Sequence, residues 1–139
     1  MFEQERFIGR LQRHAQSEAR VRVCFLSGSF GRRADDAYSD IDIALVYGRA
    51  ADRDAAWAER REFVRAVMPY VAVRSFDAEH VRPFLHVALY SNGAKADYRF
   101  ETMDGLAPNP GDHEIRILKD DNRWAESYQA ASSRLAPAQ

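Results

Sequence analysis

The stretch "SGSFGRRADDAYSDIDIALV", Ser27–Val46, contains the features on which the expected fold depends. It connects two apolar segments with the composition of buried strands, "VRVCFLS" (Val21–Ser27) and "DIDIALVY" (Asp40–Tyr47). The second segment begins with two acidic residues, Asp40 and Asp42. Because side chains alternate along a strand, both carboxylates lie on the same face. Two like charges held there repel one another unless a cation lies between them.

Length and composition set the broad class of the protein. With 139 residues and 46% hydrophobic content, we expect a single domain spanning residues 1–139. The 20 basic and 21 acidic residues nearly cancel, so the chain lacks the positive excess of a general nucleic-acid binder. No run reaches membrane-spanning length and the N-terminal segment is too charged for a signal peptide, so we expect a cytoplasmic protein with no membrane partner.

The single cysteine, Cys24, lies inside the first apolar segment. One cysteine excludes an internal disulfide and a multi-cysteine zinc site. We therefore expect Cys24 to be a buried core residue.

Helical periodicity of apolar residues occurs in three parts of the chain. It predicts helices over Glu3–Ala19, Asp52–Met68 and Arg123–Leu135. In the second helix, Asp52 is expected to be the cap and Pro69 to end the helix.

Three further segments have strand composition: Tyr70–Phe76, Phe84–Ser91 and Ala94–Thr102. The last two flank Asn92-Gly93, a strong hairpin signal, and Glu114–Lys119 is expected to be an edge strand. The patch "APNPGD" just before it, residues 107–112, resembles a linker. Together these elements predict an α+β fold with a mixed, twisted β-sheet and helices packed mainly on one face.

A third carboxylate is a candidate member of the acidic group. In the strand Ala94–Thr102, Asp97 shares a face with Lys95. If this strand lies beside Asp40–Tyr47 with its polar face on the same side, Asp97 joins the two earlier acids. Hard oxygen ligands favour Mg²⁺ or Mn²⁺ over zinc.

Each acidic residue also has a purely structural interpretation. Asp40 and Asp42 are also compatible with capping a strand at the solvent boundary. Asp97 is also compatible with a solvated strand face, since Lys95, Arg99 and Glu101 share that face with it.

The residues upstream of the two acids are suited to phosphate binding. Gly28 follows a strand and permits close backbone approach to a ligand, and a short helix is expected near residues 29–33. Its first amides and the Ser29 hydroxyl can donate to phosphate oxygens. Arg32 and Arg33 either add positive charge to that site or lie on the exposed surface. Such parts support phosphoryl or nucleotidyl transfer assisted by two metal ions.

Other chemistries are excluded by missing residues. The sequence "SGSFG" has Ser27 where a nucleophile elbow needs its first glycine. A Walker loop is excluded because the Gly-Lys pair is missing, and an EF-hand because its later ligands are missing. The four histidines show no metal-ligand spacing.

The pattern of Gly28-Ser29, ten intervening residues, Asp40-Ile41-Asp42 and a later Asp97 resembles the nucleotidyltransferase superfamily of DNA polymerase β. The resemblance covers roughly residues 21–101 and implies the nucleotidyltransferase fold. Most similar are small bacterial members: aminoglycoside and lincosamide nucleotidyltransferase-like proteins, and the minimal nucleotidyltransferases (MNT) paired with HEPN toxins.

The resemblance also implies roles for individual residues. Asp40 and Asp42 would hold two Mg²⁺ ions, and Asp97 would complete the metal that activates the acceptor and is a candidate base. Gly28 and Ser29 would hold the triphosphate. Further phosphate contacts implied in this way are Lys95, Arg32, Arg33 and Ser39.

The expected activity is that of an enzyme that moves a nucleoside monophosphate, AMP in the first instance, from an NTP such as ATP to a hydroxyl of a small molecule, such as an antibiotic, or of a protein. One alternative is an MNT-like antitoxin that neutralises a HEPN-type toxin by binding it, by adenylylating it, or by both. Another is a degenerate domain that binds nucleotides without turnover.

Two departures from the family pattern bear on the acceptor. Larger antibiotic-modifying relatives have a helical C-terminal region, whereas little beyond one helix follows Asp120 here. The acceptor pocket is therefore expected to be missing or to be completed by self-association or by a partner protein. The separation of Asp42 from Asp97 is long for a minimal member and is closer to that of the antibiotic-modifying group.

Overall fold

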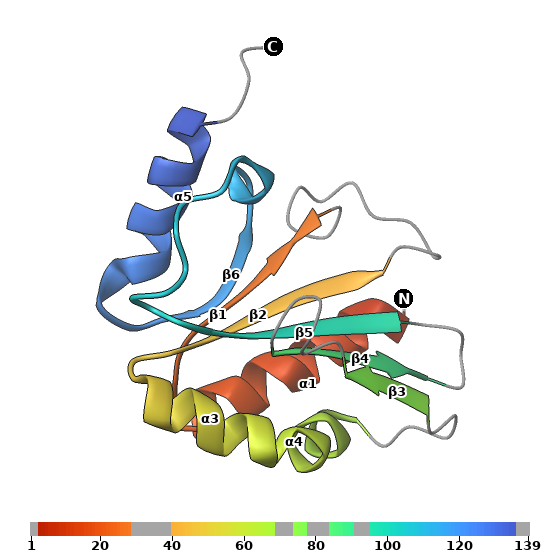
Figure 1. Ribbon diagram of the computed structural model, residues 1–139. Helices are drawn as coiled ribbons and strands as arrows, with labels where there is room; N and C mark the ends of the chain where they lie inside the picture. Colours follow the sequence, from red (N-terminus) through yellow and green to blue (C-terminus); the bar gives the residue numbers. More distant parts are fainter. Residues whose placement is uncertain (1–2, 29–39, 69–73, 78–83, 91–94, 136–139) are drawn as a thin grey trace.

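The computed structural model describes residues 3–28, 40–68, 74–77, 84–90 and 95–135. Within these ranges, the chain forms a six-stranded sheet with the strand order β3-β4-β5-β2-β1-β6 (Figure 1). The strands are β1 (Val21–Ser27), β2 (Ile41–Tyr47), β3 (Arg74–Asp77), β4 (Leu85–Leu89), β5 (Lys95–Thr102) and β6 (Arg116–Asp120). The pair β2 and β5 is parallel, and the other neighbouring pairs are antiparallel. The sheet is therefore mixed, as predicted.

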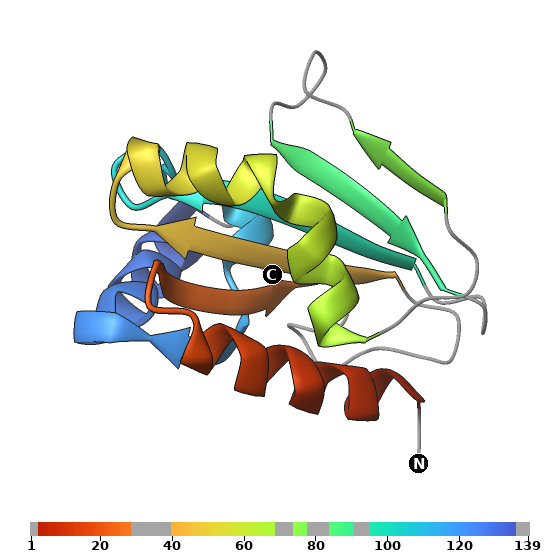
Figure 2. The ribbon, with the colours of Figure 1, turned by 90° about the horizontal axis from the view of Figure 1, so that it is seen from below.

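Helices cover the two faces of the sheet unequally. The helices described are α1 (Glu3–Ser17), α3 (Ala50–Ala58), α4 (Arg60–Val67) and α5 (Trp124–Leu135), with two short 3-10 helices, η1 (Pro110–Asp112) and η2 (Asp121–Arg123). In Figures 1 and 2, α1, α3 and α4 lie together on one side of the sheet, whereas α5 packs on the other. The α+β class and the expectation of helices mainly on one face are confirmed.

The alternation of side chains along β2 builds two cores. Ile43 and Leu45 pack in the larger core under α1, α3 and α4, whereas Ala44 and Val46 pack in the smaller core under α5. All four residues are fully buried. Because both faces of β2 are covered, its sequence is almost continuously apolar.

The first helix packs through one apolar stripe. Phe7, Ile8 and Leu11 recur at the spacing of one helix face and are buried against the sheet. Arg10 Nε donates to the Val67 carbonyl oxygen at 2.7 Å, which ties α1 to the end of α4.

The helix predicted over residues 52–68 is two helices. Glu59, with φ −102° and ψ 17°, separates α3 from α4, and its N–H donates to the carbonyls of both Ala55 and Ala56. No glycine or proline marks this break and the apolar period continues across it, so periodicity does not reveal it. The prediction of Asp52 as the cap is also wrong: the N-cap is Arg49, without a side-chain cap, and Asp52 forms an ion pair with it in the first turn.

The remaining predicted elements agree with the structure to within a few residues. The first strand has the predicted bounds, the strands on either side of Asn92-Gly93 form an antiparallel pair, and β6 pairs with β1 at the sheet edge. Cys24 is buried and free, as expected. Predictions that lie outside the described residues are the short helix at 29–33, the Asn92-Gly93 turn itself, the strand start at Tyr70 and the stop at Pro69.

Across the part of the chain that the structure describes, no helix is long and apolar enough to cross a lipid bilayer.

The central position of β2 leads to a stability prediction. Leu45→Ala should lower the free energy of unfolding by about 2–5 kcal/mol, because it leaves a cavity in the larger core. Leu135→Ala is the matched control, since Leu135 is 54% exposed and its change should fall within about 0.5 kcal/mol. Urea denaturation measures both, and equal losses would contradict this description of the core.

Candidate active site

Two of the three predicted acidic residues face each other across the parallel strand pair. Asp42 on β2 is in register with Asp97 on β5, and on its other side it is in register with Ser27, the last residue of β1. Burial, the charge of Asp97 and a hydrogen bond between the two carboxyl groups all act to raise the pKa of Asp42. The expectation that the Asp97 strand lies beside the Asp42 strand, with its polar face on the same side, is confirmed.

The surroundings of Asp42 favour its protonated form. Burial, followed by the charge of Asp97, raises its pKa to about 6 from an ordinary value of 3.8. The charge of Asp40 acts in the same direction, and the nearby guanidinium of Arg99 opposes it. A divalent cation would remove this penalty by neutralising the two carboxylates.

Lys95 connects the other two acids. Its Nζ lies 3.4 Å from Asp40 Oδ2 and 3.9 Å from Asp97 Oδ1. The charge of Asp97 is the main cause that raises the pKa of Lys95. Because Lys95 and Asp40 are both substantially exposed, these ion pairs cost little to rearrange. Lys95 thus lies at the acidic group and supplies a positive charge to it. Its expected contact with phosphate stays a prediction.

Gly28 packs directly against the Asp42 carboxylate. Its φ of +63° lies in the left-handed region, and a Cβ at this position would lie 2.6 Å from Asp42 Oδ2. A side chain here would both strain the backbone and displace the carboxylate. The sequence predicts that Gly28 lets a ligand approach the backbone closely. In this structure the group that lies closely against Gly28 is the Asp42 carboxylate.

A polar cavity of about 230 Å³ opens beside the two acids. Its lining residues are Ser27, Asp42, Leu85, Asp97, Arg99, Asn109, Gly111 and Asp112. The cavity therefore joins the ends of β1, β2 and β5 to the η1 segment that precedes β6.

Arg99 is a site residue that sequence reasoning missed. It is only 7% exposed, and its Nη2 lies 3.4 Å from Ser27 Oγ and 3.7 Å from Asp112 Oδ2. The guanidinium also lies 5.7 Å from the ring centroid of Phe25. The interpretation of a fully solvated strand face is thus wrong at Arg99. The available signal was its position two residues after Asp97, on the same face of the strand.

The segment that resembled a linker is a wall of the cavity. Asp112 in η1 is buried and accepts a hydrogen bond from the Tyr128 hydroxyl of α5. Asn109 accepts from the Gly111 N–H through its side chain and donates its own N–H to Ser132 Oγ. These bonds fix η1 on α5 and hold Asp112 close to Arg99.

The described residues fit a divalent ion in donor type and charge. Asp42 and Asp97 offer hard oxygen atoms. Burial, followed by the charge of Asp97, raises the pKa of Asp42, and a cation would relieve this penalty. Within the described ranges, no group of three or more His, Cys, Asp or Glu side chains is gathered closely enough to hold a metal ion. Asp40 is held by Lys95 instead. The predicted phosphate ligands Ser29, Arg32, Arg33 and Ser39 lie outside the described residues.

Comparison with known proteins adds no relative: no protein-family model matches the chain, and no curated protein sequence is significantly similar to it.

The raised pKa of Asp42 predicts how stability depends on pH in metal-free protein. The folded protein holds this proton more tightly than the unfolded chain, so the free energy of unfolding should fall as the pH rises from about 4 to about 6 and stay lower above that. Asp42→Asn cannot ionise, so the variant should be more stable than wild type at pH 7.5 by about 1 kcal/mol, a value reduced for the partial exposure of the carboxylate.

Urea denaturation in EDTA between pH 4.5 and 7.5 measures this effect. Asp104→Asn, an exposed carboxylate outside the cavity, is the control. The free energy of unfolding of wild type is compared with that of Asp42→Asn as the pH rises. If wild type gains stability relative to the variant, ionised Asp42 does not destabilise the fold and the prediction is wrong.

A second prediction concerns the glycine. Gly28→Ala should lower the free energy of unfolding by about 1–2 kcal/mol because alanine is strained at positive φ. Gly9→Ala within α1 is the control: its Cβ would meet only an ordinary contact at 3.7 Å, and alanine should stabilise the helix by about 0.5–1 kcal/mol. Thermal unfolding compares the two, and a Gly28→Ala protein as stable as wild type would contradict the tight packing.

Proposed function

We propose that this protein is a metal-dependent nucleotidyltransferase of the DNA polymerase β type. It moves a nucleoside monophosphate from an NTP to a hydroxyl of a small molecule or of a partner protein, such as a HEPN-type toxin. The observation that carries the proposal is the register of Asp42 against Asp97 beside a polar cavity, with Gly28 packed on the Asp42 carboxylate.

In this proposal the acidic residues hold the metal ions. Asp40 and Asp42 would hold both ions, and Asp97 would complete the ion that activates the acceptor. Lys95, which pairs with Asp40 and Asp97 in this structure, would then turn to the triphosphate. Mg²⁺ held by these residues would lower the pKa of the acceptor hydroxyl and stabilise the charge that develops on pyrophosphate.

The protein's own groups position the reactants. The acceptor oxygen attacks the α-phosphorus, the bond from that phosphorus to the bridging oxygen of the β-phosphate breaks, and pyrophosphate leaves with the bonding electrons. The Asp97 carboxylate accepts the hydroxyl proton. Arg99, held by Ser27 and Asp112, keeps a positive charge beside the two acids throughout.

The ion pairs of Lys95 favour one alternative function. Because its ammonium lies between Asp40 and Asp97, it can also serve as a permanent counter-ion in a domain that binds nucleotides without turnover. Such a domain would bind an NTP and release no pyrophosphate.

Transfer of label from each α-³²P-labelled NTP tests the proposal. The reactions contain Mg²⁺ and a panel of hydroxyl acceptors that includes aminoglycosides, lincosamides and the purified product of any adjacent HEPN-type gene. Wild type should transfer label, and Asp42→Asn and Asp97→Asn should each lose at least about a hundredfold of the rate, because each removes a metal ligand.

Asp104→Asn is the matched control and should keep the wild-type rate. Folding of each variant is checked by circular dichroism. Wild-type rates in a folded Asp42→Asn protein would refute the proposal, and NTP binding without transfer to any acceptor would favour the non-catalytic alternative.

A further inference from the structure

The guanidinium of Arg99 shares its cavity with carboxylates from two different parts of the fold. Asp42 and Asp97 come from the paired strands β2 and β5, whereas Asp112 comes from η1. Among the residues that the structure describes, Arg99 lies within ion-pair distance of Asp112 alone, with Nη2 3.7 Å from Asp112 Oδ2. The partner that Arg99 takes therefore decides which carboxylates stay open to a cation.

Arg99 is also within reach of the two strand carboxylates. It follows Asp97 by two residues on the same face of β5, and it is in register with Ala44, which follows Asp42 by two residues on β2. A long side chain can span the distance between such neighbouring positions. Although burial raises the pKa of Asp42, the charge of Arg99 opposes that shift, so the two groups already interact.

Asp112 is held in place by the last helix. It is buried, and its Oδ2 accepts a hydrogen bond from the Tyr128 hydroxyl of α5. Its backbone N–H donates to the Asn109 carbonyl oxygen at 2.9 Å, and the Asn109 N–H donates to Ser132 Oγ on α5 at 3.1 Å. Asp112 therefore cannot move away from Arg99 without the loss of these bonds.

A guanidinium as buried as that of Arg99, which is 7% exposed, needs an acidic partner because an unpaired buried charge is costly. Without the charge of Asp112, the carboxylates that remain in the described lining of the cavity are Asp42 and Asp97. Arginine binds carboxylates through two parallel hydrogen bonds, which would cover the oxygen atoms that a divalent ion needs. Loss of the Asp112 charge would thus make Arg99 a competitor of the metal.

We propose that Asp112 is a positioning residue for the candidate metal site. It holds the Arg99 guanidinium away from Asp42 and Asp97 and so leaves their oxygen atoms to a divalent ion. Tyr128 supports this role because it fixes the Asp112 carboxylate from α5. The role rests on the proposed nucleotidyl transfer, whose metal ions would occupy that site.

The affinity for Mn²⁺ tests this role, measured by electron paramagnetic resonance on the full-length chain with a non-hydrolysable NTP. Asp112→Asn should weaken Mn²⁺ binding about tenfold, because a charged hydrogen bond from Arg99 then competes with the ion. Arg99→Gln should bind Mn²⁺ at least as tightly as wild type, since a positive charge is removed from beside the ion. Circular dichroism checks the fold of each variant.

The double variant separates positioning from a direct effect of charge. In the Arg99→Gln background, Asp112→Asn should change the Mn²⁺ affinity by less than about twofold, because no guanidinium is left to compete. If Asp112 acted on the ion through its own charge, the same loss would appear in both backgrounds. A tenfold loss in both backgrounds would therefore overturn the proposal.

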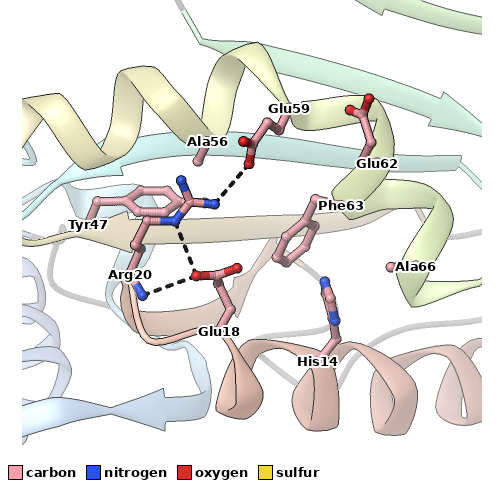
Figure 3. A pocket seen from close by; sticks show the side chains of 9 residues that line it. All are labelled: His14, Glu18, Arg20, Tyr47, Ala56, Glu59, Glu62, Phe63 and Ala66. Carbon is pink, nitrogen blue, oxygen red and sulfur yellow. Dashed lines mark hydrogen bonds and ion pairs between the residues drawn. The ribbon is translucent and has the colours of Figure 1, made fainter.

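A milder variant and a matched control complete the experiment. Tyr128→Phe keeps the Asp112 charge, folds without an unpaired guanidinium, and should weaken Mn²⁺ binding about two- to threefold in wild type but not in Arg99→Gln. Glu59→Gln is the control, because it also breaks an arginine–carboxylate pair. Its partner is Arg20, 3.0 Å away in a separate cavity beside α1 and α4 (Figure 3), so the Mn²⁺ affinity should not change.

Two negative results have different meanings. Equal Mn²⁺ affinity in wild type, Asp112→Asn and Tyr128→Phe would overturn the positioning role and leave the metal site intact. Mn²⁺ binding by wild type that is no tighter than that of the free nucleotide would overturn the metal site itself, and with it both the positioning role and the proposed function.

Discussion

The repulsion between two carboxyl groups, Asp42 and Asp97, is the constraint on which the acidic end of this molecule depends. They face each other in the parallel register of β2 and β5, and burial makes their charges costly, so the pKa of Asp42 rises to about 6. The protein places cations around them, with Arg99 on the buried side and Lys95 on the exposed side. A site that stores this much like charge is suited to a divalent ion, and a divalent ion beside a polar cavity is suited to phosphate chemistry.

The rest of the fold holds these groups in place. Covering both faces of β2 fixes its register, because a slip by one residue would exchange Ile43 and Leu45 with Ala44 and Val46 between two cores of different size. On the smaller face, the bond from Tyr128 to Asp112 joins α5 to the cavity. Helix α5 therefore both completes the core and positions one wall of the candidate active site.

Much of this arrangement was predictable from local sequence because it depends on a period of two. The alternation in Asp40–Tyr47 and in Ala94–Thr102 placed Asp42 and Asp97 on polar faces, and the Asn92-Gly93 signal paired β4 with β5. Features that depend on contacts between distant segments were not predictable. The apolar period continues across the helix break at Glu59, so periodicity does not reveal that break. Glu59 forms an ion pair with Arg20, thirty-nine residues away in the sequence. Likewise, Arg99 is drawn into the interior by Ser27 and Asp112, which no local pattern relates to it.

The most direct test of the central claim is the number of Mn²⁺ ions bound by the protein, measured by electron paramagnetic resonance with and without a non-hydrolysable NTP. If Asp42 and Asp97 form a site for metal and nucleotide, the complex of wild type with the nucleotide should bind Mn²⁺ more tightly than the free nucleotide does. Asp42→Asn and Asp97→Asn should lose this gain, whereas Asp104→Asn should keep it. Equal Mn²⁺ binding by wild type and both site variants would contradict the account, because the two carboxylates would then serve only the fold.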